Sequence, residues 1–267
     1  MEFITSTKRL LFGLLDLRYR TIWYRKRTIE FYRRFIKPGN LVFDIGSHIG
    51  NRTEIFLQLG ARVIAVEPQK AAVTTLKKRF IDNRNLVIIQ KAVSNKNGWA
   101  QLSICDEATA LSTMSDRWRN EGRFANDYHW KSIERVRTVT LDELIHRWGN
   151  PVFCKIDVEG FELPVLQGLS IPIPLVSFEF TVEFLADVPK CITHLSSIGL
   201  PQFNCSIGET MQMIFPHWVS ADKLYRRLKS FKEENLWGDI YVHFQKNSDK
   251  NLPNSIEDFK DSLRKTV

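Results

Sequence analysis

Cysteine is scarce in this sequence, and its few copies lie too far apart to suggest a shared function. Only four of the 267 residues are cysteine, and no C-x-x-C pair occurs among them. Zinc ligands and the disulfides of small secreted domains usually come in close, repeated spacings, so the sequence favours neither. We therefore expect a reducing, cytoplasmic compartment. The four cysteines are Cys105, Cys154, Cys191 and Cys205.

Long apolar runs are also missing, as are internal repeats and low-complexity segments. A membrane-spanning helix needs roughly 20 consecutive apolar residues, and the nearest candidate, LLFGLLDL at 10–17, is short and contains Asp16. No small-residue cleavage site follows it, as a secretory signal would require. The sequence thus predicts a protein that neither crosses a membrane nor is secreted. Its length and 43% hydrophobic content suit one sizeable α/β domain, alone or with an appendage.

What the sequence does have is positive charge, concentrated at one end. Residues 1–37 contain ten Lys or Arg and three acids, a net charge of +7 out of the +8 of the whole chain. Apolar and aromatic residues lie among these charges, and they predict one or two basic amphipathic helices that end before Pro38 and Gly39. Such a leader either packs on the domain with a solvated basic face, or contacts an anionic partner such as the inner face of a membrane.

Behind the leader, strand and helix signals alternate. Continuous apolar runs predict strands covered on both faces, as in a parallel sheet, and most are followed by a helical pattern. The expected architecture is a doubly wound α/β sheet with helices on both faces. We divide the chain into the basic leader (1–37), the main domain (38–245) with a long irregular insert (106–132), and a polar tail (246–267). The expected strands include 40–46, 62–68, 85–93, 99–105, 152–160, 174–180, 202–207, 211–215 and 238–244, and the expected helices include 51–60, 69–83, 190–199 and 220–235.

The segment LVFDIGSHIGN (41–51) joins the first expected strand to its helix through a turn that contains two glycines. In a doubly wound sheet, ligands bind beside this turn at the carboxyl ends of the strands. Gly46 and Gly50 allow close backbone approach, and Glu67 is placed to accept hydrogen bonds from a ribose diol. The G-x-G-x-x-G fingerprint of a dinucleotide-binding site is absent from this turn. Asp44 would also repel a pyrophosphate, whereas it would favour the amino group and sulfonium of S-adenosylmethionine. A tight turn without a ligand is the structural alternative.

Several motifs together resemble the FkbM-type family of S-adenosylmethionine-dependent methyltransferases. They occur in this order between about residues 40 and 244: FDIGSHIGN, VIAVEP, VRTVTLDEL, KIDVEGFELPVLQG, SFEF and LWGDIYVHF. The resemblance implies the class I methyltransferase (Rossmann-like) fold, a seven-stranded sheet whose last strand, here 238–244, is antiparallel. It says nothing about the N-terminal basic helical extension. It also implies S-adenosyl-L-methionine as the cofactor and O-methylation of a sugar, glycan or natural product.

The cofactor loop departs slightly from the sequence DIGANIG that is commoner in that family. Ser47 and His48 stand where the family more often has alanine and asparagine. Binding of S-adenosyl-L-methionine remains the expectation with these two residues in place. The cofactor-binding residues that we predict are Asp44, Gly46, Ser47, His48, Gly50, Glu67, Pro68 and Asp157.

Methyl transfer to a hydroxyl needs an aligned acceptor and a base that takes its proton. KIDVEG supplies candidates, because alternation along a strand would place Lys155, Asp157 and Glu159 on one face for as long as the strand persists. In that arrangement Lys155 could keep a carboxylate ionised. We predict no metal ligand set, but two alternatives stay open: the two acids hold a divalent cation, or they form a structural network in which Glu159 caps the next helix.

Other candidate catalytic residues follow neighbouring strands. Glu179 could orient the acceptor or simply bond loop amides, and His48 could act as a base or as a spacer in the cofactor loop. The aromatic residues and His129 of the insert suit stacking against a sugar, and equally suit the packing of a lid. Structural roles are expected for His194, His243 and Asp239.

Two other classes of function compete with a small-molecule or glycan acceptor. The same site could methylate a macromolecule, either an RNA or a protein side-chain amide. We expect no nucleic-acid partner, because the charge is confined to the leader and no recognition module is present. Alternatively, the protein is a non-catalytic, cofactor-binding subunit held at a membrane by its leader, although the pair Asp157 and Glu159 argues against this. The acceptor and the oligomeric state cannot be derived from the sequence.

Overall fold

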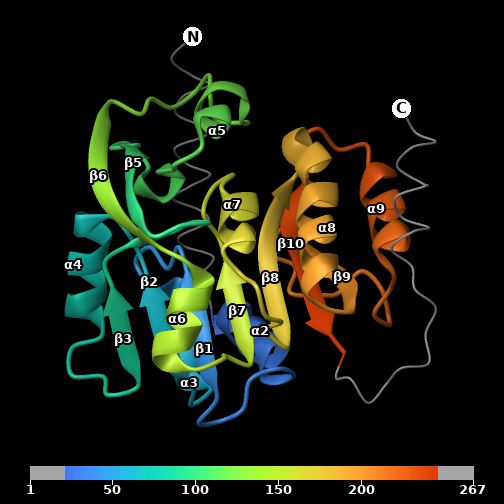
Figure 1. The fold of residues 1–267 in the computed structure, drawn as a ribbon, viewed down its shortest axis with the longest axis horizontal. Coiled ribbons are helices and arrows are strands. Elements are labelled where there is room, and N and C mark those ends of the chain that lie inside the picture. Colours follow the sequence, from blue (N-terminus) through green and yellow to red (C-terminus); the bar gives the residue numbers. More distant parts are fainter. Residues whose placement is uncertain (1–21, 246–267) are drawn as a thin grey trace.

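A seven-stranded mixed sheet forms the centre of the computed structural model, which describes residues 22–245 (Figure 1). Residues 1–21 of the leader and the tail 246–267 lie outside the described residues. The strand order is β3-β2-β1-β7-β8-β10-β9. The strands are β1 (Leu41–Ile45), β2 (Arg62–Val66), β3 (Leu86–Ile89), β7 (Phe153–Ile156), β8 (Leu175–Thr181), β9 (Pro201–Ile207) and β10 (Trp237–Phe244).

The pairing of the strands confirms the predicted fold class. Strands β3, β2, β1, β7 and β8 pair in parallel, and the last strand, β10, inserts antiparallel between β8 and β9. This is the order and polarity of the class I methyltransferase sheet that the resemblance implies. In the register of β10 and β8, Asp239 lies opposite Glu179, which brings two acids together near the carboxyl end of β8.

Helices cover both faces of this sheet (Figure 1). In the view of Figure 1, α6, α7 and α8 lie in front of the strands, and α2 and α3 lie behind them. The helix α6 begins after Thr140, whose hydroxyl accepts the Glu143 amide N–H at 3.1 Å, which is one half of a capping box. The helices are α2 (Ile22–Arg33), α3 (Asn51–Gln58), α4 (Lys70–Arg79), α5 (Asp116–Glu121), α6 (Leu141–Trp148), α7 (Glu162–Gln167), α8 (Val188–Ile198) and α9 (Ala221–Lys229).

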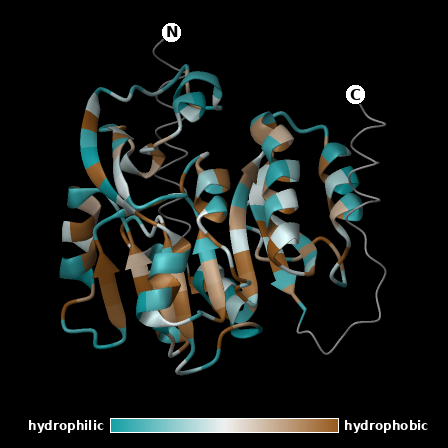
Figure 2. Ribbon diagram, in the orientation of Figure 1, coloured by the Kyte–Doolittle hydropathy of each residue, from teal (hydrophilic) through white to brown (hydrophobic). Residues whose placement is uncertain are grey.

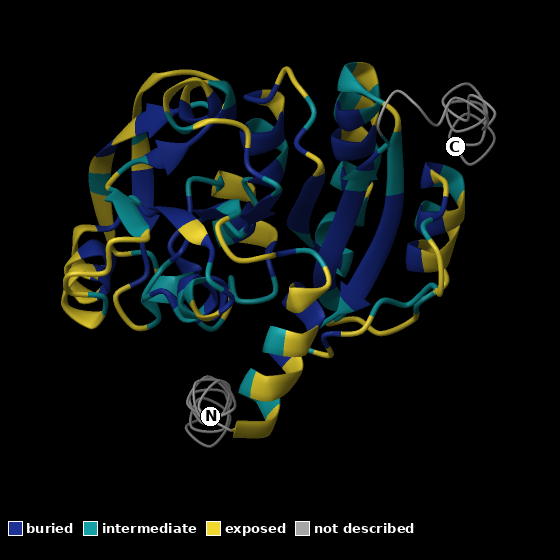
Figure 3. Cartoon of the chain, turned by 90° about the horizontal axis from the view of Figure 1, so that it is seen from below, coloured by how far each residue is buried: buried dark blue, intermediate teal, exposed yellow. Residues whose placement is uncertain are grey.

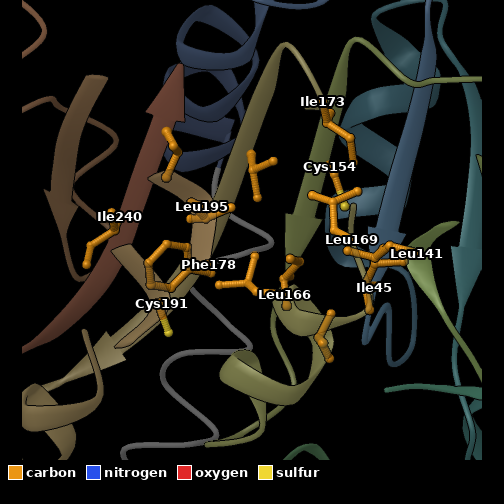
Figure 4. Packing of buried hydrophobic residues seen from close by; sticks show 14 of the residues in the cluster. Ile45, Leu141, Cys154, Leu166, Leu169, Ile173, Phe178, Cys191, Leu195 and Ile240 are labelled. Atoms are coloured by element: carbon orange, nitrogen blue, oxygen red, sulfur yellow. The ribbon is translucent and has the colours of Figure 1, made fainter. Parts of the chain in front are cut away.

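Each face of the sheet has its own apolar core, because the strands carry apolar residues on both sides. The front core joins β1, β7, β8 and β10 to α6, α7, α8 and α9, with Phe178 and Leu195 among its fully buried members (Figure 4). The rear core contains Tyr32, Phe56 and Phe153, whose rings contact one another. Figure 2 shows the same pattern, with hydrophobic strands inside and mixed hydropathy along the helices.

The part of the leader that the structure describes is a packed helix. Phe31 and Tyr32 of α2, with Ile36 just beyond it, are buried against the rear face of the sheet, at 3%, 0% and 1% exposure. The first turns of α2 project from the body, with Ile22 and Trp23 exposed (Figure 3). The packing role proposed for the leader therefore holds for α2, and its contact with an anionic partner stays a prediction. Among residues 22–245, no helix is both long and apolar enough to cross a bilayer.

A second, three-stranded sheet carries the insert over the carboxyl edge of the large sheet (Figure 1). It consists of β4 (Ala92–Val93), β5 (Gly98–Ile104) and β6 (Ser132–Val139). The expected strand 85–93 is thus two strands in two sheets. The insert itself holds a 3-10 turn, η1 (Thr109–Leu111), and the short helix α5, and a second 3-10 segment, η2 (Val182–Asp187), follows β8.

The strand expected at 211–215 is wrong. This segment forms one isolated bridge, between Met213 and Ser206, and otherwise runs as a loop. Its backbone bonds elsewhere, because the Asn204 side chain donates to the carbonyl of Phe215 at 3.0 Å and accepts from the Phe215 amide at 3.2 Å. An amide side chain thus replaces the strand partner that the apolar alternation had suggested.

Candidate active site

The order of strands reverses between β1 and β7, and the candidate active site lies at that point (Figure 1). The chain places β2 and β3 on one side of β1 and later returns to place β7 on the other, so the loops after β1 and β7 leave a crevice between them. A hollow of about 510 Å³ occupies this crevice, and we call it the first hollow. Its lining includes Gly46, His48, Glu67, Pro68, Asp157 and Glu159.

Gly46 allows the loop after β1 to touch the loop after β7. Its φ is +75°, and a Cβ at this position would lie 1.8 Å from the carbonyl oxygen of Asp157. Any other residue would push the two backbones apart, in addition to the strain of a positive φ. The first glycine of DIGSHIG is thus required by contact between two protein loops, beyond the approach to a ligand that the sequence indicated.

The buried carboxylate of Glu67 lines the first hollow. One oxygen accepts the His48 amide N–H at 2.9 Å, and the other accepts the Gln69 amide N–H at 2.9 Å. Burial raises the pKa of Glu67 to about 7, and the two amide donors only partly oppose this shift. The carboxylate is therefore fixed in position with lone pairs left for the two hydroxyls of a ribose.

Three of the predicted cofactor residues lie behind the first hollow and do not line it. Asp44 is buried and accepts a hydrogen bond from the Thr53 hydroxyl at 2.5 Å, and burial raises the pKa of Asp44 to about 6. Ser47 is buried beside the loop, and Gly50 turns the chain into α3 with a φ of +85°. Their positions support the loop from beneath.

Asp157, Glu159 and Glu179 form a carboxylate cluster at the mouth of the crevice. One oxygen from each lies within 4.8 Å of the others. Strand β7 ends at Ile156, so the expected alternation along 152–160 does not place these acids, and a turn with Glu159 at φ +54° does. Within the described part of the chain, no side-chain hydrogen bond caps α7, so the capping role that we considered for Glu159 is wrong; Glu162 instead accepts the amide N–H groups of residues 158 and 160 in the turn before the helix.

Proximity and burial shift the ionisation of this cluster. Burial raises the pKa of both Glu159 and Glu179 well above the usual range, and repulsion between the acids adds to this shift. A carboxyl with a raised pKa is suited to exchanging protons near neutrality. The cluster therefore has the chemistry expected of a base for a hydroxyl acceptor.

Lys155 lies beneath the cluster, between two acids. Its ammonium donates to Asp157 at 2.8 Å and lies 3.4 Å from an oxygen of Asp239, and the side chain is 3% exposed. Burial alone would lower the pKa of Lys155, but the charges of Asp157 and Asp239 outweigh burial and raise it. The expectation for Asp239 was a structural role, and the structure shows it as a buried partner of Lys155.

His48 faces the insert across the first hollow. Its φ is +46°, and its ring nitrogen Nε2 lies 2.9 Å from the Thr109 hydroxyl of the insert. Gln69 reaches the same segment and donates to the carbonyl of Thr109 at 3.0 Å. His48 therefore joins the cofactor loop to the insert. His129 of the insert is exposed.

A buried ionic group that the sequence reasoning missed ties α2 to the site. Arg52, in the first turn of α3, donates to Glu209 at 2.5 Å and to the hydroxyl of Tyr24 at 2.7 Å. Tyr24 in turn donates to Glu209. The three residues come from α2, α3 and the loop after β9, so only the fold brings them together, although an arginine beside the cofactor loop was a usable signal.

The carboxylate cluster is also the group of acids in the described chain that could hold a metal ion. Carboxylate oxygens at this spacing suit a divalent cation such as Mg²⁺. Asp157, however, already accepts the Lys155 ammonium. The side chain of that lysine neutralises part of the charge that a cation would otherwise balance.

A family model described as the methyltransferase FkbM domain matches residues 44–199, more than half of the chain. The chain belongs to the FkbM methyltransferase family. This confirms the family that the motifs resembled. The FkbM match contains the first hollow and the carboxylate cluster, whereas Asp239 and α2 lie outside it.

Among curated proteins, the hexuronic acid methyltransferase AglP of Haloferax volcanii is similar to this FkbM protein. The two are 29% identical over 168 residues, which is 60% of this chain and 63% of AglP. The match thus spans less than two thirds of that relative's length.

Solved methyltransferase structures also resemble the chain, at low sequence identity. A precorrin-6y C5,15-methyltransferase from Geobacter metallireducens has a TM-score of 0.44 at 9% identity, covering 83% of this chain and 87% of that one. A TehB-like S-adenosylmethionine-dependent methyltransferase from Corynebacterium glutamicum has a TM-score of 0.42 at 10% identity, covering 92% and 100%.

Proposed function

We propose that this protein transfers the methyl group of S-adenosylmethionine to a hydroxyl of a sugar or glycan. The observation that carries the proposal is the first hollow, which has a fixed carboxylate for a ribose at one wall and the carboxylate cluster at its mouth. Membership of a methyltransferase family supports the reaction class. The name of the relative AglP, a hexuronic acid methyltransferase, supports a glycan acceptor.

The residues of the first hollow fit this cofactor better than they fit a dinucleotide. Glu67 would hold the ribose hydroxyls, while the carboxylate of Asp157 places negative charge where a sulfonium would be stabilised. A pyrophosphate would meet the same acids, with Lys91 as the one cation among the residues that line the hollow. When bound, S-adenosylmethionine supplies an electrophilic methyl group on sulfur.

The chain itself contributes position and proton removal. A hydroxyl beside the carboxylate cluster would form its new O–CH₃ bond as its proton passes to a carboxylate, and the S–CH₃ bond breaks to leave a neutral thioether. Lys155 holds Asp157 in place from below, so the positions of the acids do not depend on the acceptor. Glu159 and Glu179, with their raised pKa values, are the carboxyls best suited to receive the proton.

Calorimetric titration of the full chain tests the cofactor. We expect micromolar binding of S-adenosylmethionine and S-adenosylhomocysteine and no binding of NAD. A Glu67→Gln variant should bind both methyl-cycle ligands about 10-fold more weakly or worse, because it loses a charged hydrogen-bond acceptor. Binding of NAD alone, or equal affinity in the variant, would contradict the assignment of the first hollow.

A further inference from the structure

A second hollow lies on the other side of the turn at Glu159 and Gly160. It opens between the first turns of α7 and α8, beneath α5 of the insert, and its empty space, with the part open to solvent included, is about 440 Å³. Gly160 lines this hollow, and the side chain of Trp118 packs directly on it, with its nearest ring atom 3.2 Å from where a Cβ of residue 160 would lie. We call this space between α7 and α8 the second hollow. Its lining includes Trp118, Gly160, Glu162, Glu179, Thr181 and Phe184.

The second hollow has aromatic walls. The rings of Trp118 and Phe184 lie 5.7 Å apart, tilted by 46°, and both line it. Arg117 holds these walls together, since its guanidinium lies 4.6 Å over the Phe184 ring and donates to Asp187 at 2.6 Å. Aromatic faces of this kind pack against the C–H face of a pyranose ring.

Two buried polar atoms in the lining residues have no protein partner. The indole N–H of Trp118 and the hydroxyl of Thr181 make no hydrogen bond, and these residues are 2% and 5% exposed. Leaving such groups unpaired costs stability, so a ligand that bonds to both would recover that free energy. The matched example is Trp130 of the same insert, whose indole N–H already donates to the carbonyl of Leu111 at 2.8 Å.

Glu179 connects the second hollow to the carboxylate cluster, where we place the methyl transfer. This carboxyl lines the second hollow and belongs to the carboxylate cluster, whose other two members line the first hollow. A ring packed against the wall formed by Trp118 and Phe184 would therefore present a hydroxyl to the cluster from the side opposite the first hollow. That is the relation between acceptor and cofactor that an in-line displacement needs.

The charge of the second hollow selects among sugars. Glu162, Glu179 and Asp187 line it, and no lysine or arginine does. The nearby cations are already paired: Arg117 and Lys190 bond to Asp187. Arg123 of the insert bonds to both oxygens of Glu183. The carboxylate of a uronic acid would enter this site, and lose its hydration, without an unpaired cation in the described lining to balance its charge.

We propose that the second hollow is the acceptor site and that it takes an uncharged pyranose, unlike the acid named for the relative AglP. This proposal rests on the proposed function, because it assigns the hydroxyl acceptor of the same reaction. Trp118 and Phe184 stack on the ring, Trp118 and Thr181 bond to its hydroxyls, and Glu179 lies beside the hydroxyl that is methylated. Exclusion of a charged sugar follows from the lack of an unpaired cation among the described residues of the lining.

Saturation-transfer NMR titrations of the full chain test the acceptor site, with and without S-adenosylhomocysteine. The probes are the methyl pyranosides of glucose, galactose, mannose, rhamnose and fucose, each as both anomers, with the methyl glucuronides and galacturonides for comparison. We expect at least one neutral pyranoside to bind, at least tenfold more tightly than the matching uronide. Binding by none of the neutral sugars, or equal or tighter binding of a uronide, would overturn the proposal.

Conservative variants decide whether the second hollow is the place of binding. Thr181→Val removes one unpaired polar atom and keeps the shape, whereas Trp118→Phe removes the other together with part of the ring system, and we expect each to weaken pyranoside binding at least fivefold. Trp130→Phe is the control and should bind as the unaltered chain does. Unchanged binding in both test variants would refute the site. Pyranoside binding without any binding of S-adenosylhomocysteine would sink the proposed function and leave the sugar site standing.

Discussion

At the scale of single residues, Glu67 makes cofactor binding depend on pH. Its pKa of about 7 means that the ionised form, which accepts the ribose hydroxyls, is lost as the pH falls. At pH 6 about one tenth of the molecules would carry the ionised group, so the affinity for S-adenosylhomocysteine should fall about tenfold between pH 8 and pH 6. Calorimetric titration at several pH values across this range measures the affinity for S-adenosylhomocysteine. Glu67→Gln should give a nearly flat profile, and an equally steep one would assign the effect to another group.

Lys155 and its two acids form a buried ion group whose members depend on one another. Replacing the lysine by Met leaves Asp157 and Asp239 without their shared cation, and we expect the free energy of unfolding to fall by about 3–5 kcal/mol. The double variant Lys155→Met with Asp239→Asn should recover part of that loss, because the more buried acid is then neutral. Urea unfolding at pH 7 measures both. If the losses of unfolding free energy in Lys155→Met and in Asp239→Asn simply added up in the double variant, the two residues would not interact.

The carboxylate cluster should affect turnover more than binding. In a methyl-transfer assay with the pyranoside that binds, Glu159→Gln or Glu179→Gln should lower kcat by about 100-fold or more, the usual contribution of a general base. Cofactor affinity should change little. Chelation by EDTA should leave turnover unaltered, since Lys155 already neutralises charge in the cluster. Loss of activity with EDTA, restored by Mg²⁺, would instead assign a divalent cation to the three acids.

Some of these residues could be predicted from the sequence and others could not. Gly46, Glu67 and Asp157 directly follow apolar strand runs, so the rule that sites lie at the carboxyl ends of strands was enough to select them. Asp239 lies 84 residues from Lys155 in the chain. Thr181 and Trp118 line the same hollow only because the insert, which carries Trp118, folds back over β8. Pairing over such separations leaves no local pattern in the chain.

At the scale of elements, α2 shows how a basic leader helix can also be a structural one. Its buried side chains hold it to the rear core, so Phe31→Ala should lower the free energy of unfolding by about 3–5 kcal/mol. The exposed control Lys26→Gln on the same helix should change stability by less than about 0.5 kcal/mol. Urea unfolding distinguishes them. Equal, small effects would mean that α2 does not contribute to the fold.

Elements with a continuous apolar pattern were predictable, and those set by side-chain bonds were not. The strands β1, β2, β7, β8 and β10 follow predominantly apolar runs, and both faces of the sheet are covered. The segment 211–215 has a comparable composition but bonds to the side chain of Asn204. The end of β7 was predicted too late, because the contact between Gly46 and the Asp157 carbonyl turns the chain away from the sheet.

At the scale of the whole molecule, the alternation of strands and helices was sufficient for the doubly wound sheet, and the family resemblance supplied its antiparallel last strand. The position of the insert was expected at the correct edge but without its contacts. Arg123 fixes it there, bonding to Glu183 and to the carbonyls of Asn235 and Leu236. These contacts close the second hollow, so the acceptor site is a property of the assembled fold.

The buried acids also give the whole molecule an unusual dependence of stability on pH. Burial raises the pKa of Asp44 to about 6, and of Glu67 and Glu162 to about 7, whereas in the unfolded chain these groups titrate near the ordinary values of 3.8 for Asp and 4.5 for Glu. Between about pH 4.5 and pH 7 the folded protein therefore holds protons that the unfolded chain has released. The free energy of unfolding must then decrease as the pH rises through this window.

Other groups oppose this trend only weakly. The pKa of Glu54 and Glu183 is lowered in the fold, so their contribution changes below about pH 4.5, outside the window. His243, whose pKa is lowered by burial, opposes it as a single half-buried group. We expect the Tm of the ligand-free protein to fall by on the order of 5–10 °C between pH 5 and pH 7.5. Scanning calorimetry measures the Tm at each pH, and Glu162→Gln should make the Tm depend less on pH. A Tm that rises over the same range would show that the buried acids are ionised in the fold.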